Sequence, residues 1–353
     1  MSLLLAQPNA FQPVLPRVHG GADRHGVPRH DFSVNSHAGG PCPMAQAAVA
    51  VADASSYPDA SYTALRTQLA SFHGVSLQRV QLAASASEFI FRITAVAAQH
   101  GASTVWLPKY SYGDYAQAAH AHRLKTVASL GEASLLWACE PSSPLGQSQA
   151  NMAQWWQAVD GGATGILDRA YEPLRLAGAG SLSDAQLQRV WQLWTPNKAL
   201  GLTGVRAAYA IAPVNYPSAT LTQLEQLCPS WPIGAHGVSL LTAWTQADVQ
   251  AWLAGSLGTL RLWKSQQLAL CEAMAWTCLP SQTNFYVARP NLPAGLTLAE
   301  ALNGLRAEGI KLRDTTSFGL PDHVRLSVQP PAAQCALQTA WRHVMAEHQK
   351  VAS

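Results

Sequence analysis

The sequence contains little charge. Only 12% of its 353 residues are Asp, Glu, Lys or Arg, and the formal net charge is +3. No run of basic residues stands out, so we do not expect the chain to bind nucleic acid. No apolar run is as long as a membrane span, so we expect no membrane partner.

Paired cysteines are also missing. The six cysteines, at positions 42, 139, 228, 271, 278 and 335, form no Cys-x-x-Cys pair. This scatter is typical of reduced thiols in a cytosolic protein rather than of a disulfide framework or a zinc site. The first eight residues lack the basic start and the apolar length of a signal peptide. We therefore expect a cytoplasmic protein without a bound metal.

What the chain does contain is an alternation of short apolar segments and helical segments. With 48% hydrophobic residues it can form a sizeable core. Alternation of strands and helices favours an α/β fold with a mostly parallel sheet and helices on both faces. Binding sites in such sheets gather beyond the carboxyl ends of the strands. The strands predicted for this sheet are 80–83, 104–107, 134–139, 165–168 and 209–212.

The last third of the chain has a different pattern. A long helical region is predicted at about 238–276, with an interruption near Gly255. Three more predicted strands follow, at 283–288, 310–314 and 323–328. This part is expected to form a smaller C-terminal domain, because the chain is long enough for one large and one small domain.

One stretch, residues 195–206, combines a lone lysine with a hydroxyl, two glycines and an arginine. Lys198 stands among Pro, Leu and Gly residues, with Thr195 before it and Arg206 after it. A lysine withdrawn from water can become a nucleophilic amine that forms a Schiff base. Threonine and arginine beside it suit a phosphate. The alternative is an ordinary turn with an exposed lysine, and the stretch alone leaves both interpretations open.

The pattern Ser/Thr-x-x-Lys-x-x-Gly-x-x-Gly-x-Arg resembles the cofactor segment of fold-type I pyridoxal-phosphate enzymes, the aspartate aminotransferase superfamily. The resemblance implies that Lys198 holds pyridoxal 5′-phosphate and that Thr195 and Arg206 bind its phosphate. It also implies a homodimer with a large domain built on a seven-stranded sheet and a small C-terminal α+β domain. The corresponding division is an arm at 1–40, a cofactor domain at 41–237 and a C-terminal part at 238–353.

Further motifs occur in the order that this superfamily has. The small residues Ala86 and Ser87 precede an apolar helix, where free N–H groups suit a phosphate. By resemblance, Tyr110 stacks on the pyridine ring, and Asp168 and Tyr171 contact the ring nitrogen and the phenolic oxygen. Taken singly, an aromatic residue at a strand end is usually part of a core, and an Asp there is often a helix cap.

Two more cofactor positions are less regular. The segment Tyr57-Pro-Asp resembles a family motif whose tyrosine reaches the cofactor phosphate of the partner subunit; a turn tyrosine is the alternative. The segment 140–146, Glu-Pro-Ser-Ser-Pro-Leu-Gly, resembles Asn-Pro-Asn-Asn-Pro-Thr-Gly. Ser143 therefore stands where the family has an asparagine that contacts the phenolic oxygen, and a serine hydroxyl reaches less far.

The N-terminal part resembles the threonine-phosphate decarboxylases. His19-Gly20-Gly21 and the segment 31–35, Asp-Phe-Ser-Val-Asn, match an arm that folds over the active site in that family. The resemblance implies that His19, Gly20 and Asn35 contact the substrate.

Near the C-terminus, Arg313 and Arg325 lie on two predicted strands and resemble anion-binding arginines of the superfamily. Two such arginines suit a small phosphorylated amino acid, although surface salt bridges are the ordinary role of strand arginines.

These resemblances favour decarboxylation of L-threonine O-3-phosphate to (R)-1-aminopropan-2-yl phosphate, a step of cobalamin biosynthesis. The alternative is an aminotransferase acting on histidinol phosphate or another amino acid. A third interpretation, from another class, is a degenerate homologue that binds the cofactor and has a regulatory or scaffold role.

Overall fold

A seven-stranded sheet forms the centre of the larger part of the molecule. The computed structural model describes residues 19–352, with side chains through Lys350. The strand order is β2-β8-β7-β6-β5-β3-β4, and only β8 runs antiparallel to its neighbours, so the sheet is mostly parallel as predicted. The strands are β2 (Val80–Ala83), β3 (Thr104–Trp106), β4 (Lys125–Thr126), β5 (Leu135–Cys139), β6 (Thr164–Asp168), β7 (Trp191–Trp194) and β8 (Ala208–Ile211).

Helices cover both faces of this sheet, which explains why most of its strands are almost fully buried, whereas the edge strand β4 is exposed. On β5, Leu135 and Trp137 pack toward Phe89 in α3, whereas Leu136 and Ala138 pack on the α5 side. The helices are α1 (Pro43–Ala50), α2 (Thr63–His73), α3 (Ala86–Gln99), α4 (Gly113–Ala121), α5 (Met152–Asp160), α6 (Asp184–Leu187), α7 (Ser218–Gln226) and α8 (Ala235–Trp244). Three 3-10 turns, η1 (Leu77–Arg79), η2 (Leu130–Glu132) and η3 (Glu172–Leu174), lie between them.

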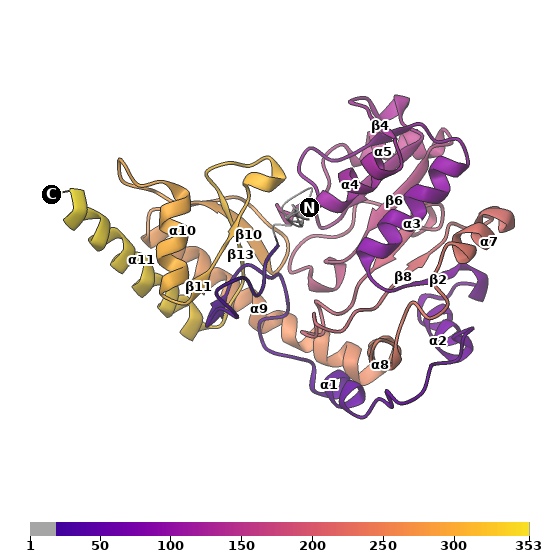
Figure 1. Cartoon of the computed structure of the whole chain (residues 1–353), viewed down its shortest axis with the longest axis horizontal. Helices are drawn as coiled ribbons and strands as arrows, with labels where there is room; N and C mark the ends of the chain where they lie inside the picture. The colour runs from indigo at the N-terminus through magenta and orange to yellow at the C-terminus, as the bar shows by residue number, and fades with distance from the viewer. Residues whose placement is uncertain (1–18, 353) are drawn as a thin grey trace, which may run out of the picture.

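The smaller part contains an antiparallel sheet of order β12-β13-β10-β9, so its α+β character agrees with the prediction. Figure 1 shows these C-terminal elements at one end of the molecule and the large sheet at the other, with α9 between them. Among the described helices, none combines the length and the apolar character needed to cross a bilayer. The elements are α9 (Ala247–Ala273), β9 (Thr277–Cys278), β10 (Phe285–Arg289), α10 (Leu298–Ala307), β11 (Ile310–Lys311), β12 (Arg313–Asp314), η4 (Thr316–Phe318), β13 (Val324–Ser327) and α11 (Pro331–Ala352).

The long helical region breaks at a different place from the predicted one. Helix α8 ends at Trp244 and α9 begins at Ala247, so α9 runs through Gly255 without interruption. The hydroxyl of Thr245 donates to the carbonyl of Thr242, and Gln246 has extended backbone angles, which ends one helix and starts the next. The predicted division at 237/238 falls inside α8, and we keep it as a proposal for the domain limits.

The N-terminal arm joins the two parts of the molecule. Strand β1 (His30–Asp31) pairs in parallel with β11 of the small domain. Farther along, the N–H groups of His37 and Cys42 donate to the carbonyls of Lys198 and Leu200, at 2.9 Å each. The arm therefore lies against both the small domain and the loop that carries Lys198.

Gly201 makes this contact with the lysine loop sterically possible. Its φ is +69°, and a Cβ atom there would lie 2.7 Å from the carbonyl oxygen of Gly40. A residue with a side chain would be strained in this conformation and would also push the arm away.

We expect Gly201→Ala to lower the free energy of unfolding by about 1–3 kcal/mol, because it combines a left-handed backbone with a backbone clash. Gly204→Ala is the matched control, because nothing lies within 4 Å of a Cβ atom at that position. Urea denaturation of both variants measures the difference. Equal stabilities would contradict the steric role of Gly201.

Candidate active site

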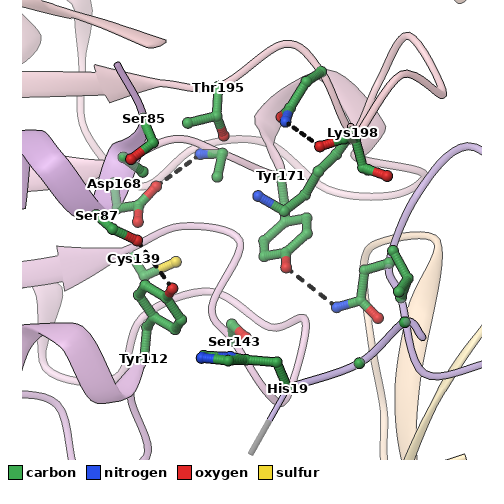
Figure 2. Close-up of a pocket in the computed structure, with 18 of the residues that line it drawn as sticks. His19, Ser85, Ser87, Tyr112, Cys139, Ser143, Asp168, Tyr171, Thr195 and Lys198 are labelled. Carbon is green, nitrogen blue, oxygen red and sulfur yellow. Dashed lines mark hydrogen bonds between the residues drawn. The ribbon is translucent and has the colours of Figure 1, made fainter. Parts of the chain in front are cut away.

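A cavity of about 370 Å³ lies where the carboxyl ends of the central strands face the N-terminal arm. The large domain, the arm and the small domain all contribute to its wall. Figure 2 shows the labelled side chains pointing into this space from the large domain and from the arm. Most of the predicted site residues line it: His19, Gly20, Asn35, Ala86, Ser87, Ser143, Asp168, Tyr171, Thr195, Lys198, Arg206 and Arg325.

Lys198 lies in the cavity and is half-buried. Its Nζ atom is 5.3 Å from the centre of the Tyr171 ring. The loop around it is held from inside, because the side-chain amide of Asn197 donates to the carbonyls of Thr203 and Val205 at 3.5 and 3.4 Å. The lysine is thus fixed at its backbone while its amine stays accessible from the cavity.

Asp168 ends β6 and is almost completely buried, with 5% of its surface exposed. Its Oδ2 accepts a hydrogen bond of 2.6 Å from the hydroxyl of Tyr115, and its Oδ1 accepts one of 2.9 Å from the N–H of Ala170. Burial raises the pKa of this carboxyl above its usual value, while these two hydrogen bonds and the charge of Lys198 oppose the rise. The site therefore contains an acidic group whose ionised form is held by specific donors.

One end of the cavity has the features of a phosphate site. The hydroxyl of Ser85 caps α3 by accepting from the N–H of Glu88, and Ser85, Ala86 and Ser87 line the cavity at this helix start. The buried hydroxyl of Thr195 has no hydrogen-bond partner among the described residues. A helix N-terminus beside an unused hydroxyl and Arg206 suits an anion.

Arg325 lies on the small-domain side of the cavity and is 7% exposed. Its Nη1 donates to the hydroxyl of Ser143 at 3.3 Å and its Nη2 to the carbonyl of Ser33 at 3.0 Å. Its Nε has no partner among the described residues, and burial lowers the pKa of its guanidinium. Nearby, the amide nitrogen of Asn35 donates to the hydroxyl of Tyr171 at 3.3 Å. Donors from three parts of the chain thus line the cavity that contains Lys198.

Three predicted residues are not part of the cavity wall, and Arg313 is the first. It lies opposite Arg325 across β12 and β13, so the two arginines are on neighbouring strands as expected. Its guanidinium donates to the carbonyl of Asp314 and the hydroxyl of Ser317, both at 2.7 Å. Burial and then the charge of Arg325 lower the pKa of Arg313 to about 10.

Tyr110 and Tyr57 are the other two. Tyr110 follows β3 but lies beside Lys109 and Gly319, and Tyr112 lines the cavity in its place. Helix α4 begins directly after Tyr112, so the backbone turns between the two tyrosines. The aromatic residue two positions after Pro108 is therefore not the one that lines the cavity. Tyr57 is 78% exposed and stacks on Trp231.

Sequence reasoning also missed residues that the structure brings to the site: Ser85, Tyr112, Tyr115, Cys139 and Asn197. Tyr112 shares a hydrogen bond of 3.1 Å with Ser87, and burial raises its pKa to about 12. Cys139 ends one predicted strand and Ser85 lies two residues after another, which is a signal that could have identified them. Tyr115 reaches Asp168 from a neighbouring helix, and no local pattern indicates such a contact.

Glu140, the other departure from the family pattern, points away from the cavity. Its carboxylate accepts hydrogen bonds from the N–H and the hydroxyl of Ser181, at 3.2 and 2.7 Å, and lies 4.0 Å from Arg175. It therefore fastens one large-domain loop to another, and Ser143 is the residue of this segment that faces the site.

Comparison with known proteins identifies the family. Residues 30–337 match the aminotransferase class I and II family. The chain belongs to this family. It is a fold-type I enzyme, and membership implies pyridoxal 5′-phosphate as its cofactor.

The curated relatives are distant. Histidinol-phosphate aminotransferase 1 of Bacillus cereus is 25% identical, with 77% of this chain and 76% of that protein covered. Histidinol-phosphate aminotransferase of Haloquadratum walsbyi is also 25% identical, with 84% of this chain and 81% of that protein covered.

Solved structures share the fold. The histidinol-phosphate aminotransferase of Sinorhizobium meliloti, in complex with pyridoxal-5′-phosphate, has a TM-score of 0.73 at 20% identity, covering 89% of this chain and 90% of that one. The L-threonine-O-3-phosphate decarboxylase of Porphyromonas gingivalis has a TM-score of 0.71 at 18% identity, covering 89% of this chain and 99% of that one. At these identities the likeness shows the fold alone.

The residues of the cavity fit this cofactor. A buried carboxylate suits a protonated ring nitrogen, and the unused hydroxyl of Thr195 beside a helix start suits the phosphate. Lys198 offers an accessible amine in the same cavity.

We expect Tyr115→Phe to weaken cofactor binding about tenfold, since it removes a hydrogen bond to a charged group worth ~1.5 kcal/mol. The variant also raises the pKa of Asp168 further, because a donor to the ionised form is lost. An ionised Asp168 would hold the ring nitrogen, so binding should fall as the pH drops through this pKa, and in the variant the fall should begin at a higher pH. Titration of the apoprotein with pyridoxal phosphate at several pH values measures both effects.

Tyr209→Phe is the control for this prediction. Tyr209 is equally buried and is hydrogen-bonded to His73 and Trp244, but it has no contact with Asp168. Its pH profile of cofactor binding should match that of the wild type. If the Tyr115→Phe profile also matched the wild type, Tyr115 would have no influence on Asp168.

Proposed function

We propose that this enzyme decarboxylates L-threonine O-3-phosphate to (R)-1-aminopropan-2-yl phosphate. The observation that carries the proposal is the convergence of His19, Gly20 and Asn35 from the arm with Arg325 on the cavity that contains Lys198. The arm also supplies the sequence resemblance to threonine-phosphate decarboxylases.

In this proposal each residue has a distinct task. Lys198 holds the cofactor through its amine, Asp168 pairs with the ring nitrogen, and Tyr171 with Ser143 faces the phenolic oxygen. Ala86, Ser87, Thr195 and Arg206 bind the phosphate, and Tyr112 rather than Tyr110 is the aromatic residue available to the ring.

Pyridoxal phosphate, when bound, accepts the electron pair of a bond that breaks at the α-carbon of an amino substrate. In decarboxylation the bond from the α-carbon to the carboxylate carbon breaks, CO2 leaves, and a proton takes its place on the α-carbon. Arg325 orients the carboxylate, because a guanidinium binds it through two parallel hydrogen bonds. The Lys198 amine is the group available to deliver the proton.

Transamination of histidinol phosphate is the second candidate, and the names of the curated relatives favour it. The two reactions differ in what the protein must hold. Decarboxylation needs an anchor for the α-carboxylate, whereas histidinol phosphate has no carboxylate and would present its phosphate to the same arginine. Both candidates share a small phosphorylated substrate.

We further propose a cytoplasmic homodimer. Tyr57 and its stacking partner Trp231 are exposed at 78% and 43%, which leaves an aromatic pair available to a second copy of the chain. In that dimer Tyr57 contacts the cofactor phosphate of the other subunit. Sedimentation analysis of wild type and Tyr57→Ser tests the assembly.

The deciding assay measures CO2 released from L-threonine O-3-phosphate by the cofactor-loaded enzyme without any keto acid. We expect release that is lost in Lys198→Ala, because the variant has no amine at this position. Turnover of histidinol phosphate that requires a keto acid would replace the proposal with the aminotransferase. Cofactor binding with neither activity would favour the degenerate homologue.

We expect Arg325→Lys to raise KM for L-threonine O-3-phosphate about tenfold or more, because an ammonium cannot form the two-pronged contact. Its cofactor affinity should stay close to that of the wild type. Arg313→Lys distinguishes the roles of the two arginines. A rise in KM comparable to that of Arg325→Lys would support a role for Arg313 in binding a second anionic group. An unchanged KM in Arg325→Lys would contradict its assignment to the substrate.

A further inference from the structure

The N-terminal arm contributes one wall of the cavity and is also bound to the small domain by side chains that do not line the cavity. Its residues His19, Gly20, Ser33 and Asn35 face the site. In addition to the pairing of β1 with β11, Asp23 of the arm binds two cations of the small domain: Arg306 near the end of α10, and Lys311 in β11. We call these three residues the arm clasp.

The clasp is a dense set of short contacts. The Nε and Nη2 atoms of Arg306 donate to the two carboxylate oxygens of Asp23 at 3.0 and 2.9 Å. The Nζ atom of Lys311 lies 3.0 Å from Oδ2 of the same carboxylate. The two cations also bind arm backbone, since Arg306 donates to the carbonyl of Gly26 at 2.9 Å and Lys311 to that of Gly21 at 2.6 Å.

This geometry distinguishes the clasp from an ordinary surface ion pair, which contributes little to stability. One carboxylate receives a two-pronged guanidinium and an ammonium, and each cation binds a further backbone carbonyl of the arm. The hydrogen bonds from Arg306 and then Lys311 hold the pKa of Asp23 well below its usual range. In the network each side chain restrains the others, so the orientation of the arm is fixed at several points.

The same arm contacts the catalytic side of the small domain. The N–H of Gly21 donates to the hydroxyl of Ser33 at 3.0 Å, and the carbonyl of Ser33 accepts from Arg325 at 3.0 Å. A short chain of contacts thus leads from the clasp through Gly21 and Ser33 to the arginine in the cavity.

We propose that Asp23, Arg306 and Lys311 are positioning residues that fasten the arm to the small domain, so that the two act as one cover over the site. The clasp sets how well the arm residues and Arg325 hold a ligand. It does not touch the cavity and takes no part in the chemical step.

Limited trypsin cleavage of the cofactor-loaded enzyme tests the fastening without any substrate. Arg24 and Arg29 are exposed residues of the arm, and cleavage after them requires local release of the chain. We expect Arg306→Gln to accelerate cleavage at both sites about fivefold, and Arg306→Gln combined with Lys311→Gln to accelerate it further. These substitutions leave the sequence around the cleaved bonds unchanged.

Arg189→Gln is the matched control. It removes an exposed arginine that forms an ion pair with Asp160, with 2.6 Å between Nη1 and Oδ1. Neither residue belongs to the arm. Its cleavage rate should stay within about twofold of the wild type. If the double variant, shown by its melting temperature to be folded, were cleaved at the wild-type rate, the proposal would be overturned.

A second measurement separates positioning from general loosening, and it rests on the proposed function. Arg306→Gln should raise KM for L-threonine O-3-phosphate about fivefold while kcat falls by less than about half. Asp23→Asn should reproduce this shift, because it removes the charge but keeps an oxygen for the local turn with His25. A fivefold loss in kcat with an unchanged KM would overturn the positioning role. Absence of any turnover in the wild type would reject the substrate but leave the cleavage result valid.

Discussion

A carboxylate kept out of water, Asp168, is the constraint around which the site is built. Burial disfavours its charge, and the structure offsets this with the Tyr115 hydroxyl, the Ala170 N–H and the nearby Lys198. The central sheet holds these groups in place, because Asp168 ends a strand whose neighbours are buried on both faces. A buried carboxylate with fixed hydrogen-bond donors suits a protonated ring nitrogen.

The cavity depends on three segments that are distant in the sequence. The large sheet supplies Asp168 and the lysine loop, the arm supplies His19 and Asn35, and β13 supplies Arg325. The arm connects the other two segments, because the N–H of His37 donates to the carbonyl of Lys198 and the carbonyl of Ser33 accepts from Arg325.

Much of the architecture could be predicted because local patterns determine it. The apolar runs indicated five strands of the large sheet, and residues such as Thr195 and Ser87 follow strands or begin a helix, where side chains converge. The short, mixed segment 191–194 was not predicted as a strand, although it forms β7.

Contacts made at a distance were less predictable. Which of Tyr110 and Tyr112 lines the cavity depends on how the chain turns into α4, and the break before α9 falls at Thr245 and Gln246 rather than at a glycine. The partner of Asp168, Tyr115, lies 53 positions away, and no spacing rule links them.

The opposed arginines of β12 and β13 have a thermodynamic consequence. Arg313 and Arg325 are directly paired across the two strands, and their mutual repulsion lowers the pKa of Arg313 beyond the effect of burial. An anion bound at Arg325 relieves that repulsion, so occupation of the site and integrity of the C-terminal sheet are coupled. Under this coupling, heat resistance of the small domain becomes a reporter of its ligand, and anions that never react with the cofactor protect it according to their concentration and affinity.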